Sequence, residues 1–207
     1  MDTLARYFGT IPADQAEMLR RYHALIVQWN SKINLISRKD IGNFWRKHIL
    51  PCLCISKVLR FVPGSSAVDV GTGGGLPGIP LAITNGDVNF TLVDSVGKKI
   101  LAVENMVKKL ALKHVRVINA RIENMEEKFD YVVARAVTDL PNFLKNIGNI
   151  CRNGTRIFYI KGADFTDETC GLSHVRIHNM GELLGDDDFA DKVIIEIRNE
   201  QQKNSLA

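Results

Sequence analysis

The sequence predicts a doubly wound α/β fold with a mostly parallel sheet and an N-terminal helical cap. Apolar residues recur at helical spacing over the first 62 residues, and short apolar strands then alternate with helices. The first of these strands leads directly into Gly71-Thr72-Gly73-Gly74-Gly75. Alternating strands and helices predict a parallel sheet with helices on both faces. We therefore expect a helical cap over residues 1–62, packed on a body over residues 63–207 in one compact unit.

The cap is expected to contain three helices. Asp14, with Glu17 three residues later, forms a capping-box pattern that predicts the start of the first helix. Apolar residues follow at helical spacing up to Trp29. Asp40 is a candidate cap for a second helix, which Pro51 is expected to interrupt. A third, short helix is expected over residues 53–61.

The body is expected to contain six strands joined mainly by helices. We predict strands over residues 67–70, 90–93, 115–118, 131–134, 156–160 and 193–197. Helices are predicted from Gly78 onward and over residues 98–112 and 140–151. In such a sheet, ligands bind at the carboxyl ends of the strands.

Composition limits the class of protein. The chain has 207 residues, of which 45% are hydrophobic and 24% charged, as in folded globular domains and unlike disordered or collagen-like chains. It contains no run of about 18 uncharged apolar residues, and its first ten residues lack the apolar core of a signal peptide. The four cysteines lack the spacing of a metal site or a disulfide framework. We therefore expect a cytoplasmic protein with reduced thiols, no bound metal and no membrane partner.

Charge is distributed unevenly along the chain. Residues 1–62 contain 10 Lys and Arg against 4 Asp and Glu, whereas residues 163–207 contain 4 against 10. A basic front and an acidic tail favour a polyanionic partner that approaches from one side. The alternative is that these charges are only solvated.

The glycine-rich turn is the strongest local signal for a ligand site. Glycines let the backbone approach a ligand closely, and a side chain at Gly73 is expected to intrude on that ligand. Gly73-x-Gly75-x-x-Gly78 formally matches the dinucleotide fingerprint, but Asp69 in the strand and Pro77 and Pro80 at the helix start fit it poorly. S-adenosylmethionine carries a sulfonium cation and no phosphate, so it suits a turn beside an acid better than NAD does. A tight turn without a ligand is the remaining alternative.

Further candidate residues follow the second, third and fourth predicted strands. Asp94 could hydrogen-bond ribose hydroxyls or cap the next helix. Ile122 could cover an adenine, and Glu123 could bind its edge or be a surface acid. Arg135 offers a rigid fork of donors for substrate, for cofactor or for a structural ion pair with Asp139.

Several segments together resemble the RsmG (GidB) family. They are Trp29-Asn30-x-x-Ile33-Asn34-Leu35, Lys47-His48-Ile49-Leu50, Asp69 to Ala82, Leu92-Val93-Asp94-Ser95-x-Gly97-Lys98-Lys99, Arg121-x-Glu123, Ala134-Arg135-Ala136 and Lys161-Gly162. The resemblance implies a class I, Rossmann-like methyltransferase that uses S-adenosyl-L-methionine. Its substrate would be N7 of one guanine in bacterial 16S, small-subunit ribosomal RNA. We further expect the protein to be a monomer.

The resemblance also implies roles for individual residues. Gly71 and Leu76 would contact the cofactor in the turn, Asp94 would bind its ribose, Ile122 and Glu123 would hold its adenosine, and Arg135 would lie beside the methyl donor as the catalytic residue. The chain departs from the family at Pro51-Cys52, where Asp-Ser is usual. This departure is expected to end the helix early.

The residues also limit the chemistry. Guanine N7 carries a lone pair and no proton, so its methylation needs positioning and charge stabilisation and no general base. The fourth strand ends in Ala134-Arg135-Ala136-Val137. It therefore lacks the Asn/Asp-Pro-Pro-aromatic motif of amino-group methylation and the cysteine nucleophile of pyrimidine C5 methylation. Two other classes stay open: an NAD-dependent oxidoreductase, although no Tyr-x-x-x-Lys pair has convincing spacing, and a non-catalytic RNA-binding module.

Overall fold

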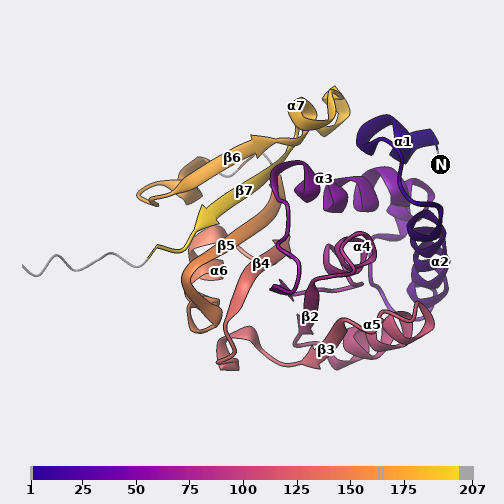
Figure 1. Cartoon of the computed structure of the whole chain (residues 1–207), viewed down its shortest axis with the longest axis horizontal. Coiled ribbons are helices and arrows are strands. Elements are labelled where there is room, and N and C mark those ends of the chain that lie inside the picture. Colours follow the sequence, from indigo (N-terminus) through magenta and orange to yellow (C-terminus); the bar gives the residue numbers. More distant parts are fainter. Residues whose placement is uncertain (1, 163, 165, 201–207) are drawn as a thin grey trace, which may run out of the picture.

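The computed structural model describes residues 2–162, 164 and 166–200, which form a seven-stranded sheet in the order β3-β2-β1-β4-β5-β7-β6 (Figure 1). The strands are β1 (Ser66–Val70), β2 (Asn89–Asp94), β3 (Val115–Asn119), β4 (Phe129–Arg135), β5 (Cys151–Gly162), β6 (Val175–Asn179) and β7 (Lys192–Arg198). The first five strands pair in parallel, and β7 is antiparallel to both β5 and β6. The predicted doubly wound, mostly parallel α/β fold is therefore confirmed.

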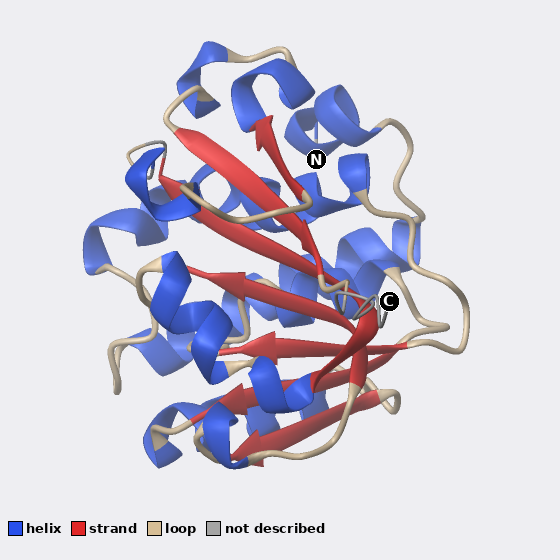
Figure 2. Cartoon of the chain, turned by 90° about the vertical axis from the view of Figure 1, so that its left-hand side faces the viewer, coloured by secondary structure: helices blue, strands red, loops and turns tan. Residues whose placement is uncertain are grey.

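Helices cover both faces of the sheet (Figure 2). The α-helices are α1 (Asp2–Phe8), α2 (Ala13–Asn30), α3 (Leu50–Val58), α4 (Gly78–Thr84), α5 (Gly97–Lys109), α6 (Leu140–Asn146) and α7 (Met180–Leu184). One apolar cluster joins α2, α3, α4 and α5 to one face, and a second joins α6 to the other. Successive strand residues enter opposite clusters, because side chains of a strand alternate between its faces. Ala67 belongs to the first cluster and Val68 to the second.

Residues of the expected cap share the first cluster with residues of the body. Leu19, Ile26 and Leu53 are buried together with Leu81 and Val103. The cap therefore forms part of the main core, and the boundary at residue 62 stays a prediction. Among the described residues, no helix combines the length and the apolar character that crossing a membrane requires.

The predicted capping box is wrong. α2 begins at Ala13, after Pro12, and no side chain caps it. Pro12 supplies the extended backbone that precedes the helix (φ −50°, ψ 139°). Asp14 therefore lies inside the first turn, and Glu17 pairs with Arg20 on the helix surface (2.6 Å).

Pro51 does not interrupt the second helix of the cap. A π-helical turn, Trp45–Ile49, continues directly into α3, and Pro51 lies in the first turn of that helix. Proline is tolerated there because a first-turn N–H has no partner within the helix. Asp40 caps no helix either: it lies in a 3-10 segment, Arg38–Asn43, and pairs with Lys47 (2.6 Å).

Other helix ends also differ from the prediction. α3 ends at Val58, α5 ends at Lys109, and the 140–151 segment divides into α6 and a 3-10 turn, Gly148–Ile150. Three elements, α1, α7 and β6, are absent from the prediction. β6 pairs with β7 alone and no residue in it is fully buried, so its sequence lacks an apolar strand pattern.

An ion-pair cluster joins the acidic tail to the basic cap. Asp186 accepts hydrogen bonds from the Tyr7 hydroxyl and from Arg46 (3.1 Å). Arg46 also pairs with Asp188, and its guanidinium lies 5.0 Å from the centre of the Phe189 ring. These contacts neutralise part of the positive charge of the cap and part of the negative charge of the acidic tail within the molecule. The two segments are far apart in the sequence and meet beside α1 and α7 (Figure 1).

Candidate active site at the glycine-rich turn

The glycine-rich turn connects β1 to α4 at the carboxyl end of β1. Gly71 and Gly73 have φ values of 69° and 57°, in the left-handed region that favours glycine. A Cβ atom on Gly71 would lie 2.9 Å from the Val137 side chain, whereas one on Gly73 would meet only the Gly71 carbonyl oxygen, at 3.8 Å. Gly73 therefore presents bare backbone to open space.

A fully buried carboxyl group ties the turn to α4. Oδ2 of Asp69 accepts hydrogen bonds from the Thr72 hydroxyl (2.6 Å) and from the backbone N–H of Gly78 (2.8 Å). Gly78 begins α4, so the carboxyl satisfies one of the N–H groups that a helix start leaves free. Burial raises the pKa of Asp69 to about 7, against the opposite effect of the two hydrogen bonds. The group therefore titrates near neutral pH.

Asp94 connects the turn to the end of β2. Its Oδ2 accepts from the backbone N–H of Gly73 and its Oδ1 from that of Val96, both at 2.9 Å. Val96, and not Asp94, occupies the N-cap position of α5, so the helix-cap alternative is wrong. Each carboxylate oxygen has a second lone pair, which leaves Asp94 able to accept further hydrogen bonds from a ligand.

The other predicted cofactor residues differ in exposure. Ile122 is buried in the same apolar cluster as Val70 and Val93. Val70 is the last residue of β1, and Val93 is the second-last residue of β2. Glu123 is exposed, 3.7 Å from Arg121. Leu76 is buried in the opposite cluster, and its backbone N–H donates to the Thr72 carbonyl (2.9 Å). Cofactor contacts of these three residues stay predictions.

Arg135 ends β4 and reaches the helical cap. Its Nη2 donates to the Lys47 carbonyl (3.1 Å) and to Nδ1 of His48 (3.0 Å), and its Nη1 lies 4.0 Å from Cys52 Sγ. The expected alternative, an ion pair with Asp139, is wrong. Asp139 is instead the N-cap of α6 and accepts from the backbone N–H of Asn142.

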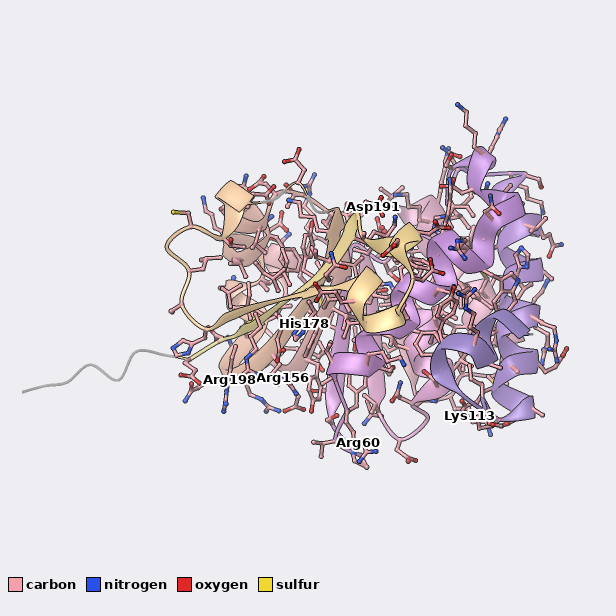
Figure 3. All side chains as sticks on the ribbon, turned by 90° about the horizontal axis from the view of Figure 1, so that it is seen from above. Arg60, Lys113, Arg156, His178, Asp191 and Arg198 are labelled. Carbon is pink, nitrogen blue, oxygen red and sulfur yellow. The ribbon has the colours of Figure 1, made fainter. Side chains whose placement is uncertain are left out.

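A cavity of about 200 Å³ adjoins Arg135 at the carboxyl ends of β4 and β5. Its lining residues are Pro51, Arg135, Ala136, Ile160, Lys161, Gly162, Asp191 and Lys192. Asp191 lies on the side of the molecule opposite Arg60, Arg156 and Arg198 (Figure 3). Those arginines belong to the amino edge of the sheet, so their charges lie away from the site.

Several residues that shape the site were not predicted. The Tyr22 hydroxyl, fully buried, donates to the Gly74 carbonyl (2.8 Å) and fixes α2 on the turn. The Tyr159 hydroxyl accepts from the backbone N–H groups of Val137 and Thr138 and so holds the loop after β4. These contacts follow no local sequence pattern; Tyr22 and Gly74, for example, are 52 residues apart. His48 lies in Lys47-His48-Ile49-Leu50, one of the segments that resemble the family, but no pattern in the sequence predicts its contact with Arg135.

The fold is that of class I S-adenosylmethionine-dependent methyltransferases. It combines this sheet order with an open glycine-rich turn after β1 and an acid, Asp94, at the end of β2. A solved S-adenosylmethionine-dependent methyltransferase from Aquifex aeolicus has a TM-score of 0.58 at 15% identity, over 79% of this chain and 98% of that one. The family model described as rRNA small subunit methyltransferase G matches residues 15–182. The chain belongs to this family, which confirms the resemblance to RsmG (GidB).

Relatives that carry the family name cover nearly the whole chain. The Ribosomal RNA small subunit methyltransferase G of Flavobacterium johnsoniae is 38% identical over 95% of this chain and 97% of its own length. That of Bacteroides fragilis is 39% identical over 94% of this chain and 98% of its own length. The likeness therefore includes both the cap and the body.

An added methyl group should destabilise the fold more at Gly78 than at Gly73. In Gly78→Ala the Cβ would lie 2.2 Å from Leu92 and 2.7 Å from Asp69 Oδ2, so we expect a loss of about 1–3 kcal/mol in the free energy of unfolding, or more. Gly73→Ala meets no side chain and should cost about 1 kcal/mol through backbone strain. Urea denaturation checks both. Equal losses would contradict the packing described here.

The buried carboxyl should make stability depend on pH. Between about pH 4 and 7 the folded state retains the Asp69 proton, whereas the unfolded state has released it. Stability from this group is therefore complete at low pH and is lost as pH rises toward 7. We expect wild type to lose stability relative to Asp69→Asn over this range, by up to about 1.4 kcal/mol per pH unit.

Denaturation of both proteins at pH 5 and pH 8 checks this slope. His48, whose pKa is lowered to about 4 by burial and by the Arg135 charge, contributes the opposite slope between about pH 4 and 6.5. Its contribution is the same in both proteins, so it cancels in their difference. A difference that does not change with pH would mean that Asp69 is already ionised in the folded state.

Proposed function

We propose that this protein transfers a methyl group from S-adenosylmethionine to N7 of one guanine in small-subunit ribosomal RNA. The observation that carries the proposal is the bare backbone at Gly73, whose N–H donates to Asp94. This turn lies at the carboxyl edge of the sheet, where β4 ends in Arg135. The proposal includes a monomeric enzyme in the bacterial cytoplasm, where its RNA substrate is located.

The residues around the turn fit this cofactor. Gly71 and Gly73 leave open space beside the backbone of the turn, where the cofactor would bind. A Cβ atom on Gly73 would occupy part of that space. Asp94 has lone pairs left for ribose hydroxyls, and Ile122 offers an apolar surface for the adenine beside Glu123. Leu76 would complete the turn. No helix-start phosphate site is needed, and Asp69 already occupies the first N–H of α4, which argues against a dinucleotide pyrophosphate there.

When bound, the cofactor supplies an electrophilic methyl group on a sulfonium. The task of the protein is then to hold donor and acceptor in line and to exclude water. Arg135 is the catalytic residue of the proposal, because its planar fork offers several fixed donors at the carboxyl end of β4. Two donors of Nη2 are already used by Lys47 and His48. One N–H of Nη1 is directed at Cys52 Sγ, so Nε and the other N–H of Nη1 are left to bind guanine O6 or a phosphate.

The neighbours of Arg135 are unsuited to base or nucleophilic catalysis. Burial raises the pKa of the Cys52 thiol to about 12, so the thiolate needed for pyrimidine C5 methylation is scarce at neutral pH. Nδ1 of His48 accepts from Arg135 and its Nε2 is buried. An acceptor that needs no proton removal, such as guanine N7, suits this environment.

The surface charge near the cap supports an RNA substrate. Arg46 and Lys47 are paired within the molecule, but Arg38 and Lys39 are exposed and have no ion pair among the described residues. They directly precede Asp40 in the 3-10 segment that approaches His48. We propose that these two side chains contact the phosphate backbone of the substrate.

Loss of the acid after β2 should weaken cofactor binding. Asp94→Ala removes the proposed ribose acceptor and releases the Gly73 N–H, so we expect S-adenosylmethionine binding to weaken by roughly 1–3 kcal/mol. Isothermal titration calorimetry measures this change. The matched control is Asp130→Ala, which removes a partly buried acid that accepts from Ser66 at the start of β1. An unchanged affinity in Asp94→Ala would remove Asp94 from the cofactor site.

Loss of Arg135 should slow methyl transfer at every pH. Because guanine N7 carries no proton that must be removed, wild type should show no rising limb from an enzyme base between about pH 6 and 9. We expect Arg135→Ala to reduce the single-turnover rate by on the order of 100-fold without reshaping the profile. Arg135→Lys should recover little, since an ammonium lacks the planar fork.

Chemical cleavage of the product RNA at 7-methylguanosine locates the methyl group. Calorimetry with S-adenosylmethionine and NAD in parallel tests the cofactor. Methyl groups on an exocyclic amine or a pyrimidine carbon would refute the proposed function, as would a rate that follows a titrating side chain.

A further inference from the structure

The guanidinium of Arg135 is held from outside its own strand. Both hydrogen bonds of Nη2 are accepted by the π-helical turn of the cap, through the Lys47 carbonyl and His48 Nδ1. The two partners lie 88 and 87 residues away in the sequence. The conformation of this side chain therefore depends on the cap.

Pro51 cannot donate a hydrogen bond to the first of these acceptors. In a regular helix the N–H of residue 51 would donate to the Lys47 carbonyl, four residues earlier. Proline has no N–H and cannot make that bond, and the Lys47 carbonyl accepts a hydrogen bond from Arg135. The π-helical turn just before α3 belongs to a type of local irregularity that recurs at functional sites.

The second acceptor fixes the proton position on His48. An arginine can only donate, so Nδ1 must accept and the proton of the neutral ring lies on Nε2. The ring is 6% exposed and stacks on Phe44, with ring centres 5.5 Å apart and planes 26° apart. Nε2 is buried and lies 3.5 Å from Oδ2 of Asp40, whose Oδ1 pairs with Lys47 (2.6 Å). Nε2 makes no hydrogen bond to the described residues, so the stacking on Phe44 and the bond from Arg135 hold the ring in place.

We propose that His48 is a positioning residue for methyl transfer: as a neutral acceptor, it fixes the Arg135 guanidinium at the carboxyl end of β4. This inference rests on the proposed function, because it assigns His48 an effect on the reaction only through Arg135. With Nη2 saturated by the cap and one N–H of Nη1 directed at Cys52 Sγ, Nε and the second N–H of Nη1 remain for the substrate. His48 itself does not contact the reacting atoms.

The test compares variants that keep or remove the acceptor. His48→Phe keeps an aromatic ring against Phe44 but cannot accept from Arg135, so we expect kcat to fall by on the order of 10- to 100-fold. KM for S-adenosylmethionine should stay within about twofold of wild type. His48→Asn places an amide oxygen near the position of Nδ1 and should recover part of the loss. The matched control is His23→Phe, because His23 stacks on the same Phe44 (4.7 Å) without contacting Arg135.

A double-mutant cycle separates positioning from folding. If His48 acts through Arg135, His48→Phe should cause no further loss of kcat in the Arg135→Ala background, although any fall in melting temperature should recur there. A residue that only supports the fold would lower kcat in both backgrounds. Nitrogen-15 NMR of the wild-type protein gives a readout that does not depend on turnover. At pH 7.5 we expect His48 Nδ1 to be unprotonated and Nε2 to be protonated.

The outcomes distinguish this inference from the proposed function. Unchanged kcat in His48→Phe, with a slow Arg135→Ala, overturns the inference alone, and so does a protonated Nδ1 in the NMR spectrum. Wild-type protein that leaves guanine N7 unmethylated overturns the proposed function. Unchanged kcat in Arg135→Ala overturns the inference and the catalytic role of Arg135, while the methyl transfer itself would stand.

Discussion

The arrangement of the site depends on one buried carboxyl group. Asp69 lies in the middle of the sheet, and its Oδ2 accepts both from the Thr72 side chain and from the first N–H of α4. These bonds fix the path of the chain between β1 and α4, and hence the left-handed backbone at Gly71 and Gly73. Burying an acid in an apolar sheet is costly, which is why its pKa rises to about 7. The hydrogen bonds to the turn offset part of that cost.

The helical cap belongs to the active site as much as to the core. Tyr22 of α2 donates to the Gly74 carbonyl on one side of the turn, and the π-helical turn accepts from Arg135 on the other. The open space at Gly73 thus lies between elements of the body that the cap holds in place. A Cβ on Gly74 would lie 3.2 Å from Ile26 and 3.3 Å from Leu35, so cap and turn meet closely. Detachment of the cap would therefore disturb both the cofactor turn and Arg135.

Charge has two separate uses in this fold. Asp186 and Asp188 pair with Arg46, and Tyr7 donates a hydrogen bond to Asp186. These contacts attach the acidic segment around residue 186 to the basic cap. Arg38 and Lys39 have no such partners among the described residues. A sequence count of +6 for the front cannot separate these cations, because pairing depends on which residues the fold brings together. The net field that an RNA meets is consequently smaller and more local than the count implies.

The sequence by itself determined the mostly parallel sheet, except for β6, and the position of the glycine-rich turn at its carboxyl edge. Apolar strands alternating with helices require two covered faces, and Gly71 to Gly75 after β1 requires a ligand-sized turn at the carboxyl edge. Local patterns also marked Asp94 and Arg135 as candidate site residues, because both follow apolar strand patterns; their roles toward cofactor and substrate stay predictions. Only the tertiary structure decided their partners. The bonds of Asp94 to Gly73, of Tyr22 to Gly74 and of Arg135 to His48 join residues 21, 52 and 87 positions apart. Pro51 shows the same limit. Its missing N–H signals a helix break in isolation, whereas the fold places it in the first turn of α3, next to a π-helical turn whose Lys47 carbonyl accepts from Arg135.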